Sequence, residues 1–133
     1  MKFEWSPEYS VGVKILDEQH KQLILMMDKL IKSIDDQETK NLAENLDELR
    51  KLKENHFSTE EKYFKEFCYP EAETHIKEHD KFRKKVASLS GKCKKKEIES
   101  SFETIDFLED WLINHILEVD KRYTKCFNEH GLN

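Results

Sequence analysis

Glycine and proline are scarce in this chain, which has three glycines and two prolines among its 133 residues. A fold of many short strands and tight turns needs more of both, because these residues supply the backbone conformations of turns. Charged residues make up 38 % of the sequence and aromatic residues 11 %. This balance favours helices with solvated outer faces around one core and argues against disorder. We expect a single domain spanning residues 1–133.

Cysteine is also rare, and its pattern lacks pairs. Cys68, Cys93 and Cys126 are odd in number, widely spaced and outside any C-x-x-C motif. We therefore expect reduced thiols in a cytoplasmic protein and neither a disulfide framework nor a zinc knuckle. The sequence assigns no role to these three thiols.

Long apolar runs and an excess of positive charge are both missing. The N-terminus carries no apolar segment of the signal-peptide kind, so we expect no membrane insertion. The formal net charge of −5 gives no reason to expect nucleic acid or an anionic membrane as a partner. The one basic cluster, residues 92–96, is predicted to lie in a solvated loop.

Apolar residues recur at steps of three and four through most of the chain, which predicts amphipathic helices. Four helices are expected: one following Asp17, one over about 40–67, one carrying positions 75–89 and one over about 98–127. Short connections make neighbouring helices antiparallel. The predicted fold is therefore all-α, an up-down-up-down four-helix bundle.

Three segments outside these helices complete the predicted fold. Residues 1–14 hold aromatic side chains without helical spacing, which predicts an extended arm packed on the bundle. Residues 88–96, with Gly91 near their centre, are predicted to be a connecting loop. The last residues, 129–133, are expected to be frayed.

Histidines and carboxylates occupy the inward-facing side of all four helices. One histidine on an apolar face is most simply a hydrogen-bonded core residue, but five of the six histidines lie on these faces. A buried set so rich in imidazole and carboxylate needs a metal to satisfy it. His130, in the tail, lies off these faces and carries no such prediction. The candidate ligands are His20, His56, Glu60, His75, His79, His115 and Asp120.

The spacing of these residues also predicts a local irregularity. His56 and Glu60 are four residues apart, as are His75 and His79, so each pair shares one face of a helix. His115 and Asp120 are five apart, which turns Asp120 about 140° away on a regular α-helix. One extra residue between them, such as a π-bulge, would bring Asp120 inward.

The donor types restrict the metal. Seven side chains exceed the four ligands of a structural zinc site. Imidazole and carboxylate without thiolate suit iron or manganese better than copper(I), magnesium or calcium. If both carboxylates bridge two octahedral ions and a solvent oxygen joins them, one coordination position stays open. Ferritin-like bundles use Glu-x-x-His, and no histidine of this chain has glutamate three residues before it.

Four motifs together resemble the hemerythrin family, and specifically its prokaryotic single-domain members, the bacteriohemerythrins. They are Asp17-Glu18-Gln19-His20, His56-Phe57-x-x-Glu60, His75-x-x-x-His79, and Trp111-Leu112-x-x-His115 followed by Asp120. The resemblance spans about residues 5–127. It implies two iron ions, one bound by His75, His79 and His115 and the other by His20 and His56. It also implies that Glu60 and Asp120 bridge them beside an oxo or hydroxo group, with the open position on the second iron.

The same resemblance implies reversible O2 binding by a carrier, store or delivery protein, and not an enzyme. Residues one turn from the ligands are predicted to form a dry, apolar pocket that keeps bound O2 from leaving as peroxide. No side chain there is a recognisable acid, which favours binding over turnover. A di-iron oxidoreductase acting on peroxide or nitric oxide, an O2 sensor and an iron-handling protein stay as alternatives. The predicted O2 pocket consists of Leu23, Ile24, Phe57, Trp111, Leu112 and Ile116.

Overall fold

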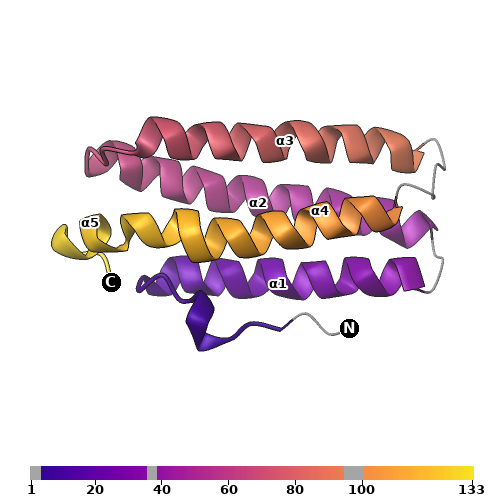
Figure 1. Cartoon of the computed structure of the whole chain (residues 1–133), viewed down its shortest axis with the longest axis horizontal. Coiled ribbons are helices and arrows are strands. Elements are labelled where there is room, and N and C mark those ends of the chain that lie inside the picture. Colours follow the sequence, from indigo (N-terminus) through magenta and orange to yellow (C-terminus); the bar gives the residue numbers. More distant parts are fainter. Residues whose placement is uncertain (1–3, 36–38, 95–100) are drawn as a thin grey trace.

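The computed structural model of the chain describes residues 4–35, 39–94 and 101–133. Every regular element in those ranges is a helix. Figure 1 shows the long helices lying lengthwise beside one another, with successive helices running in opposite directions. They are α1 (Lys14–Asp35), α2 (Thr39–Glu66), α3 (Ala72–Lys94) and α4 (Ser101–Asn114), and the short α5 (Thr124–Glu129) follows α4. The predicted antiparallel four-helix bundle is confirmed.

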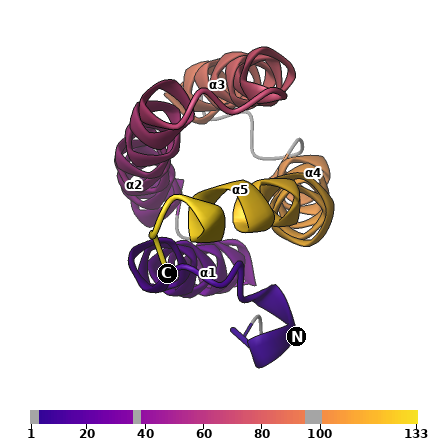
Figure 2. The same ribbon diagram turned by 90° about the vertical axis from the view of Figure 1, so that its left-hand side faces the viewer.

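The end-on view in Figure 2 shows how the helices enclose a common interior. Helix α1 packs on α2 and α4, and α2 packs on α3. Two clusters of buried apolar residues fill this interior, a larger one that includes Phe57 and a smaller one that includes Phe64. On α2, Glu60 lies between those two phenylalanines, so the polar centre is enclosed by apolar packing along the bundle axis.

The predicted loop at residues 88–96 is wrong over the part that the structure describes. Helix α3 continues through Gly91 to Lys94, and residues 95–96 lie outside the described ranges. Gly91 is half-buried, and a glycine inside a helix costs only about 1 kcal/mol relative to alanine. Val86 and Leu89 are buried on the same helix, and their packing outweighs that cost.

Helix α2 ends in a tight left-handed turn. Cys68 has φ 50°, and the Tyr69 N–H donates to the Phe64 carbonyl at 2.9 Å, which is the hydrogen bond of a Schellman cap. Pro70 follows and cannot continue the helix. This turn reverses the chain so that α3 returns beside α2.

The N-terminal arm packs on the bundle, as predicted, although it includes one 3-10 turn at Pro7–Tyr9. Asp17 is an acid of the first turn of α1, and its carboxylate accepts from the Val11 N–H at 2.8 Å. Val11 and Val13 are buried, and the Thr124 hydroxyl donates to the Val11 carbonyl at 2.6 Å. The arm is therefore held by hydrogen bonds to the first turn of α1 and to the start of α5.

The predicted fraying of the C-terminal residues is also wrong. The Leu132 N–H donates to the Phe127 carbonyl at 2.9 Å, and the Asn128 amide donates to the Leu132 carbonyl at 2.8 Å. Gly131 supplies the left-handed conformation that this turn requires, with φ 85°. Separately, none of the helices in the described part of the chain has the length and apolar character needed to cross a membrane.

Candidate metal centre

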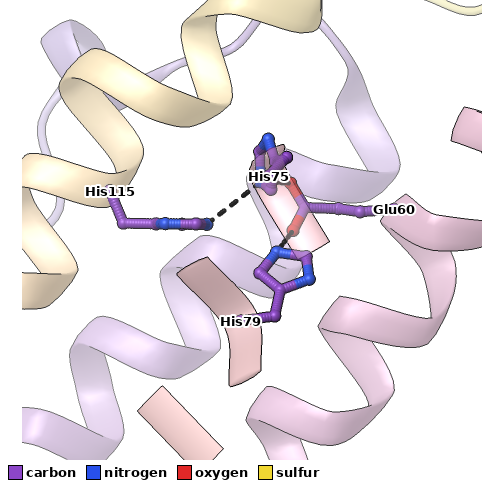
Figure 3. A group of neighbouring side chains, drawn as sticks. All are labelled: Glu60, His75, His79 and His115. Atoms are coloured by element: carbon purple, nitrogen blue, oxygen red, sulfur yellow. Dashed lines mark hydrogen bonds and ion pairs between the residues drawn. The ribbon is translucent and has the colours of Figure 1, made fainter. Parts of the chain in front are cut away.

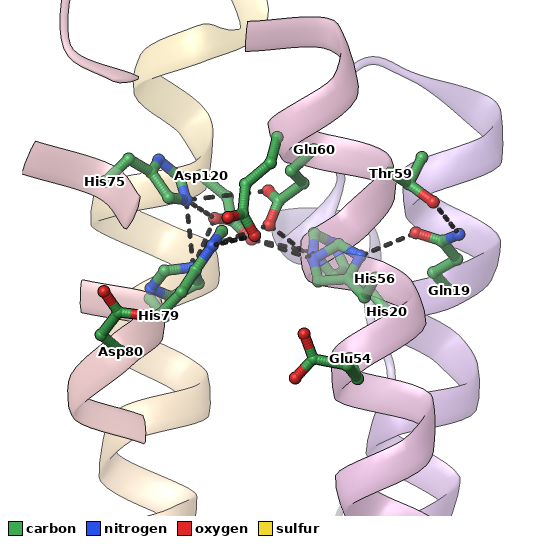
Figure 4. A network of polar contacts seen from close by, with 12 residues as sticks. Gln19, His20, Glu54, His56, Thr59, Glu60, His75, His79, Asp80 and Asp120 are labelled. Atoms are coloured by element: carbon green, nitrogen blue, oxygen red, sulfur yellow. Dashed lines mark hydrogen bonds and ion pairs between the residues drawn. The ribbon is translucent and has the colours of Figure 1, made fainter. Parts of the chain in front are cut away.

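The seven predicted ligand residues meet in one place, although they come from α1, α2, α3 and the segment that follows α4. Helix α1 contributes one, α2 and α3 contribute two each, and the segment after α4 contributes two (Figure 4). Every one of them is buried, with exposed fractions of 3 % or less. The residues are His20, His56, Glu60, His75, His79, His115 and Asp120.

The donor atoms form two neighbouring groups. Glu60, His75, His79 and His115 make one group, which Figure 3 shows with all four side chains converging. His20, His56 and Asp120 make the other. Within each group the candidate ligand atoms lie within 4.8 Å of one another. This is the arrangement that two metal ions side by side would require.

The two carboxylates lie between these groups. The Glu60 Oε1 atom is 3.2 Å from His56 Nε2 and 3.1 Å from His79 Nε2. The two oxygens of Asp120 contact histidines of different groups. Its Oδ2 atom is 2.9 Å from His20 Nε2, and its Oδ1 atom is 2.8 Å from His115 Nε2. Each carboxylate thus touches histidines of both groups, as a bridging ligand must.

A metal fits this site because the protein does not satisfy these donors. In the described part of the chain, both oxygens of Glu60, the Oδ1 atom of Asp120 and the Nε2 atom of His79 lie close to one another's groups but make no contact with the full geometry of a hydrogen bond. Two imidazole pairs even bring Nε2 atoms together, His20 with His56 at 3.0 Å and His75 with His115 at 3.2 Å. Buried carboxylates left in this state are costly, and bound cations remove that cost.

Asp120 reaches the centre because the helix is irregular there. Residues His115–Val119 form a π-helical turn, and the Asp120 N–H donates to the His115 carbonyl, five residues back. The predicted extra residue is therefore confirmed. Asp120 and His115 both become buried on the inward face, after which a 3-10 turn, Asp120–Tyr123, leads into α5.

Hydrogen bonds behind the ligands fix the orientation of two imidazoles. The Nδ1 atom of His56 lies 2.8 Å from the Gln19 Oε1 atom, and the Gln19 amide donates to the Thr59 hydroxyl at 3.0 Å (Figure 4). The Nδ1 atom of His79 lies 3.4 Å from the Glu61 carboxylate, which also accepts from Arg83. A proton held on Nδ1 leaves the Nε2 lone pair free to bind a metal.

The electrostatics favour neutral imidazoles at His20 and His115 and an ionised carboxylate at Asp120, whereas at His56 burial is outweighed by the charge of Glu60, which raises the pKa. Burial lowers the pKa of His115 to about 4 and also lowers that of His20. Burial alone would raise the pKa of Asp120, but the charge and hydrogen bond of His115, with further hydrogen bonds from His20 and His56, hold it well below its usual value. Neutral imidazoles beside an ionised carboxylate form a ligand set ready for a cation.

The six residues of the predicted O2 pocket belong to the larger core cluster. Five are buried and Trp111 is half-buried. Two of them pack directly on ligands: the Phe57 ring stacks on His79 with centroids 3.8 Å apart, and Trp111 stacks on His115 at 4.2 Å. The other four are Leu23, Ile24, Leu112 and Ile116.

One charged side chain in this apolar region was not predicted. Lys53 is 1 % exposed, and its Nζ atom lies 4.4 Å from the Trp111 ring centroid and 5.1 Å from that of Phe57. Burial lowers the pKa of Lys53 to about 8, against the opposing charges of Asp120 and Glu60. A protonated lysine can donate a proton, so the expectation that no side chain near the pocket is a recognisable acid is wrong.

The sequence contains a signal for Lys53. It lies four residues after Leu49 and three before His56, on the same inward face of α2. A lysine at such a position is usually taken for a solvated residue whose long stem extends to the surface. Here its three nearest aromatic rings, of Trp111, Phe57 and Phe82, surround the ammonium group instead.

Comparisons with known proteins agree with this centre. Residues 11–126 match the hemerythrin HHE cation binding domain. Bacteriohemerythrin of Methylococcus capsulatus is 33 % identical over 121 residues, covering 91 % of this chain and 92 % of that protein. Myohemerythrin of Theromyzon tessulatum is 34 % identical over 121 residues, covering 91 % and 90 %.

Solved structures agree as well. A crystal structure of wild-type hemerythrin matches with a TM-score of 0.85 and 33 % identity, covering 92 % of this chain and 95 % of that one. A leucine-to-tyrosine variant of hemerythrin matches with a TM-score of 0.88 and 32 % identity, covering 95 % and 98 %.

Proposed function

This chain belongs to the hemerythrin family, and from that membership we propose that it binds O2 reversibly at a non-heme di-iron centre. The observation that carries the proposal is the convergence of seven buried imidazole and carboxylate side chains at one point in the bundle, several of whose polar atoms make no hydrogen bond. One iron would be held by His75, His79 and His115, and the other by His20 and His56. Glu60 and Asp120 would bridge the pair.

A bound iron pair supplies the two electrons that O2 takes up on binding and returns on release. The chain's own residues prepare the centre for that chemistry. Gln19 and Glu61 hold protons on the Nδ1 atoms of His56 and His79, so that their Nε2 atoms face inward. Phe57 and Trp111 cover the ligands with aromatic rings and exclude water.

We propose a binding role, as carrier, store or delivery protein, in preference to catalysis. The wall of the pocket is almost wholly apolar, which favours a ligand that enters and leaves unchanged. Turnover of peroxide or nitric oxide is the second candidate, and the observation in its favour is the buried ammonium group of Lys53. Turnover assays with either substrate on the iron-loaded protein separate the two roles.

An optical spectrum combined with metal analysis tests the proposal. The protein is reduced under argon, then exposed to air, then returned to argon. We expect two irons per chain and a visible charge-transfer band that forms with O2 and disappears on its removal. The His79→Ala variant should lose iron, whereas the His130→Ala variant, altered at an exposed histidine, should retain it. Irreversible conversion to a ferric spectrum would overturn reversible binding, and a protein without iron would overturn the cofactor.

A further inference from the structure

Two cysteines, Cys68 and Cys126, line one surface cavity that the proposed function does not use. We propose that they are a reversible dithiol–disulfide pair, which reduces hydrogen peroxide and, once oxidised, links the turn after α2 to α5. The pairing of the two thiols stands apart from the proposed function, and only the choice of peroxide as the oxidant rests on it.

The two cysteines come from segments that are distant in the sequence but close in the fold. Figure 1 shows the turn between α2 and α3 at the same end of the bundle as α5, and both thiols line a cavity of about 440 Å³ there. The ring centroids of Phe67 and Tyr69, on either side of Cys68, lie 5.6 Å and 6.4 Å from that of Phe127. Because Cys126 directly precedes Phe127, the turn and α5 pack together where the thiols lie.

Both thiols are free and open to a small oxidant. The Cys68 side chain is exposed and that of Cys126 is half-buried. Burial, the charge of Glu129 and the charge of Cys68 together raise the pKa of Cys126. The two sulfurs are therefore near enough for their charges to interact. A disulfide bond removes both charges at once.

Cys68 also has a backbone conformation that favours glycine. Its φ is 50°, and it lies at the position of the cap of α2 where glycine is the usual residue. A side chain in this left-handed conformation strains the backbone, because its Cβ atom approaches the following carbonyl oxygen. Strain of this kind at a reactive side chain supports a functional role for that side chain.

Peroxide oxidises the pair in two steps that balance. The Cys68 thiolate attacks one oxygen of hydrogen peroxide, the O–O bond breaks, and a sulfenic acid and a molecule of water form. The Cys126 sulfur then attacks the Cys68 sulfur, the S–S bond forms, the S–O bond breaks and a second water leaves. The two sulfurs lose two electrons and peroxide gains them. A dithiol reductant restores both thiols by exchange.

A second cavity supports hydrogen peroxide as the oxidant. This cavity, of about 210 Å³, shares Tyr69 and Arg122 with the first and is also lined by the candidate ligand His75. Hydrogen peroxide that leaves the proposed O2-binding centre on this side would be released close to the two thiols. The positive charges of Arg122 and Lys125, which line the thiol cavity, favour the thiolates that react with it.

The third cysteine provides a matched control. Cys93 lies near the C-terminal end of α3, whereas the thiol cavity lies beside the start of that helix. The two places are about 30 Å apart along the helix axis. A disulfide requires Cα atoms within about 7 Å, so Cys93 cannot join Cys68 within one chain.

Peroxide treatment of the full chain tests the inference. It is carried out on the iron-loaded protein and on the zinc-loaded protein, in which the metal does not itself react with peroxide. Two of the three thiols should be lost, the mass should fall by that of two hydrogen atoms, and digestion should yield peptides joined through positions 68 and 126. Dithiothreitol should restore both thiols. Cys93→Ser should form the same link, whereas Cys68→Ser and Cys126→Ser should form no link within the chain.

Absence of joined peptides from the unaltered chain would overturn the inference, and so would a link that forms only between two chains on a non-reducing gel. The O2-dependent band of the iron-loaded protein reports on the proposed function separately. A link that forms in the zinc-loaded protein while that band is absent from the iron-loaded protein would reject O2 binding alone.

Thermal melting provides a second readout of the link. A disulfide between positions 68 and 126 restricts the unfolded chain, so oxidation should raise the melting temperature by roughly 5 to 15 °C. Oxidised Cys93→Ser should show the same rise and peroxide-treated Cys126→Ser should show none. A rise of equal size in Cys126→Ser would overturn the link as its cause. Circular dichroism before treatment identifies any variant that fails to fold.

Discussion

Among individual side chains, Lys53 has the clearest effect on the free energy of unfolding. Its pKa falls from 10.5 to about 8 on folding because it is completely buried. A difference of this size corresponds to about 3 kcal/mol of lost stability. Between pH 8 and 10.5 the unfolded chain binds the proton and the folded chain does not, so stability rises with pH through that window. The penalty is complete below pH 8 and disappears above 10.5.

Lys53→Met should therefore stabilise the metal-free protein by about 3 kcal/mol at pH 7, with a smaller gain at pH 10. Urea denaturation at both pH values measures this, with Lys65→Met as the matched exposed control. A gain of the same size at both values would contradict burial of the charge as its cause.

Leu112 tests the apolar character of the pocket. It is buried in the same cluster as Phe57, three residues before His115. Leu112→Thr would admit water and a hydroxyl beside the bound ligand, so the O2-bound protein should decay several-fold faster to the ferric state. Stopped-flow spectroscopy follows that decay. Leu46→Thr, a buried change ten residues before His56 on α2, controls for general destabilisation, and an unchanged lifetime would exclude Leu112 from the pocket.

Residue identity alone predicted which imidazoles and carboxylates converge in the interior, but it did not predict the burial of Lys53, and both results have one physical reason. Histidine and carboxylate on an apolar face are unusual enough to indicate a metal. Lysine has a long apolar stem, so its presence on such a face does not reveal whether the ammonium group lies inside the bundle or at the surface. Only the packing of Trp111, Phe57 and Phe82 around the ammonium group decides that it stays inside.

The helical elements were predictable wherever burial follows a regular spacing. The interruption between His115 and Asp120 was also predictable, because the inward face itself slips by one residue there. The end of α3 was not, because Gly91 and the lysines after it form a strong local loop signal. Helix α3 continues past Gly91 because Val86 and Leu89 are buried in the bundle, and the sequence does not reveal which residues they pack against.

The π-helical turn makes an unusual prediction about chain length. Glu118 is exposed, so its deletion removes the extra residue without removing a packed side chain. Asp120 then follows His115 by four residues on a regular helix and still faces inward. Inserting one alanine after Glu118 instead rotates Asp120 and α5 by about 100°. The deletion variant should keep its metal and the insertion variant should lose it.

Metal analysis and thermal melting of both variants check this prediction. If the deletion released metal as completely as the insertion, the turn would be needed for more than placing Asp120 on the inward face.

The candidate metal centre joins the bundle as a whole, because α1, α2, α3 and the segment after α4 each contribute a candidate ligand side chain. Around that centre the arm adds its own attachment: Val11 and Val13 are buried, and the Asn128 amide donates to the Gly12 carbonyl at 3.2 Å. Without metal, the buried carboxylates and imidazoles at the middle of the bundle leave polar atoms without hydrogen bonds on α1, α2, α3 and the segment after α4. Metal binding therefore stabilises all the helices together and not one loop.

Removal of the metal by a chelator should lower the melting temperature of the entire chain in one cooperative transition. A ligand present at 100 times its dissociation constant stabilises a protein by about 2.7 kcal/mol, and a tightly held metal pair exceeds that value. Calorimetry of the loaded and chelated protein measures the difference, and His130→Ala should show the same difference as the unaltered chain. Removing a metal pair that binds side chains from all parts of the bundle should destabilise the whole bundle. Equal melting temperatures with and without metal would therefore mean that apolar packing alone stabilises the fold.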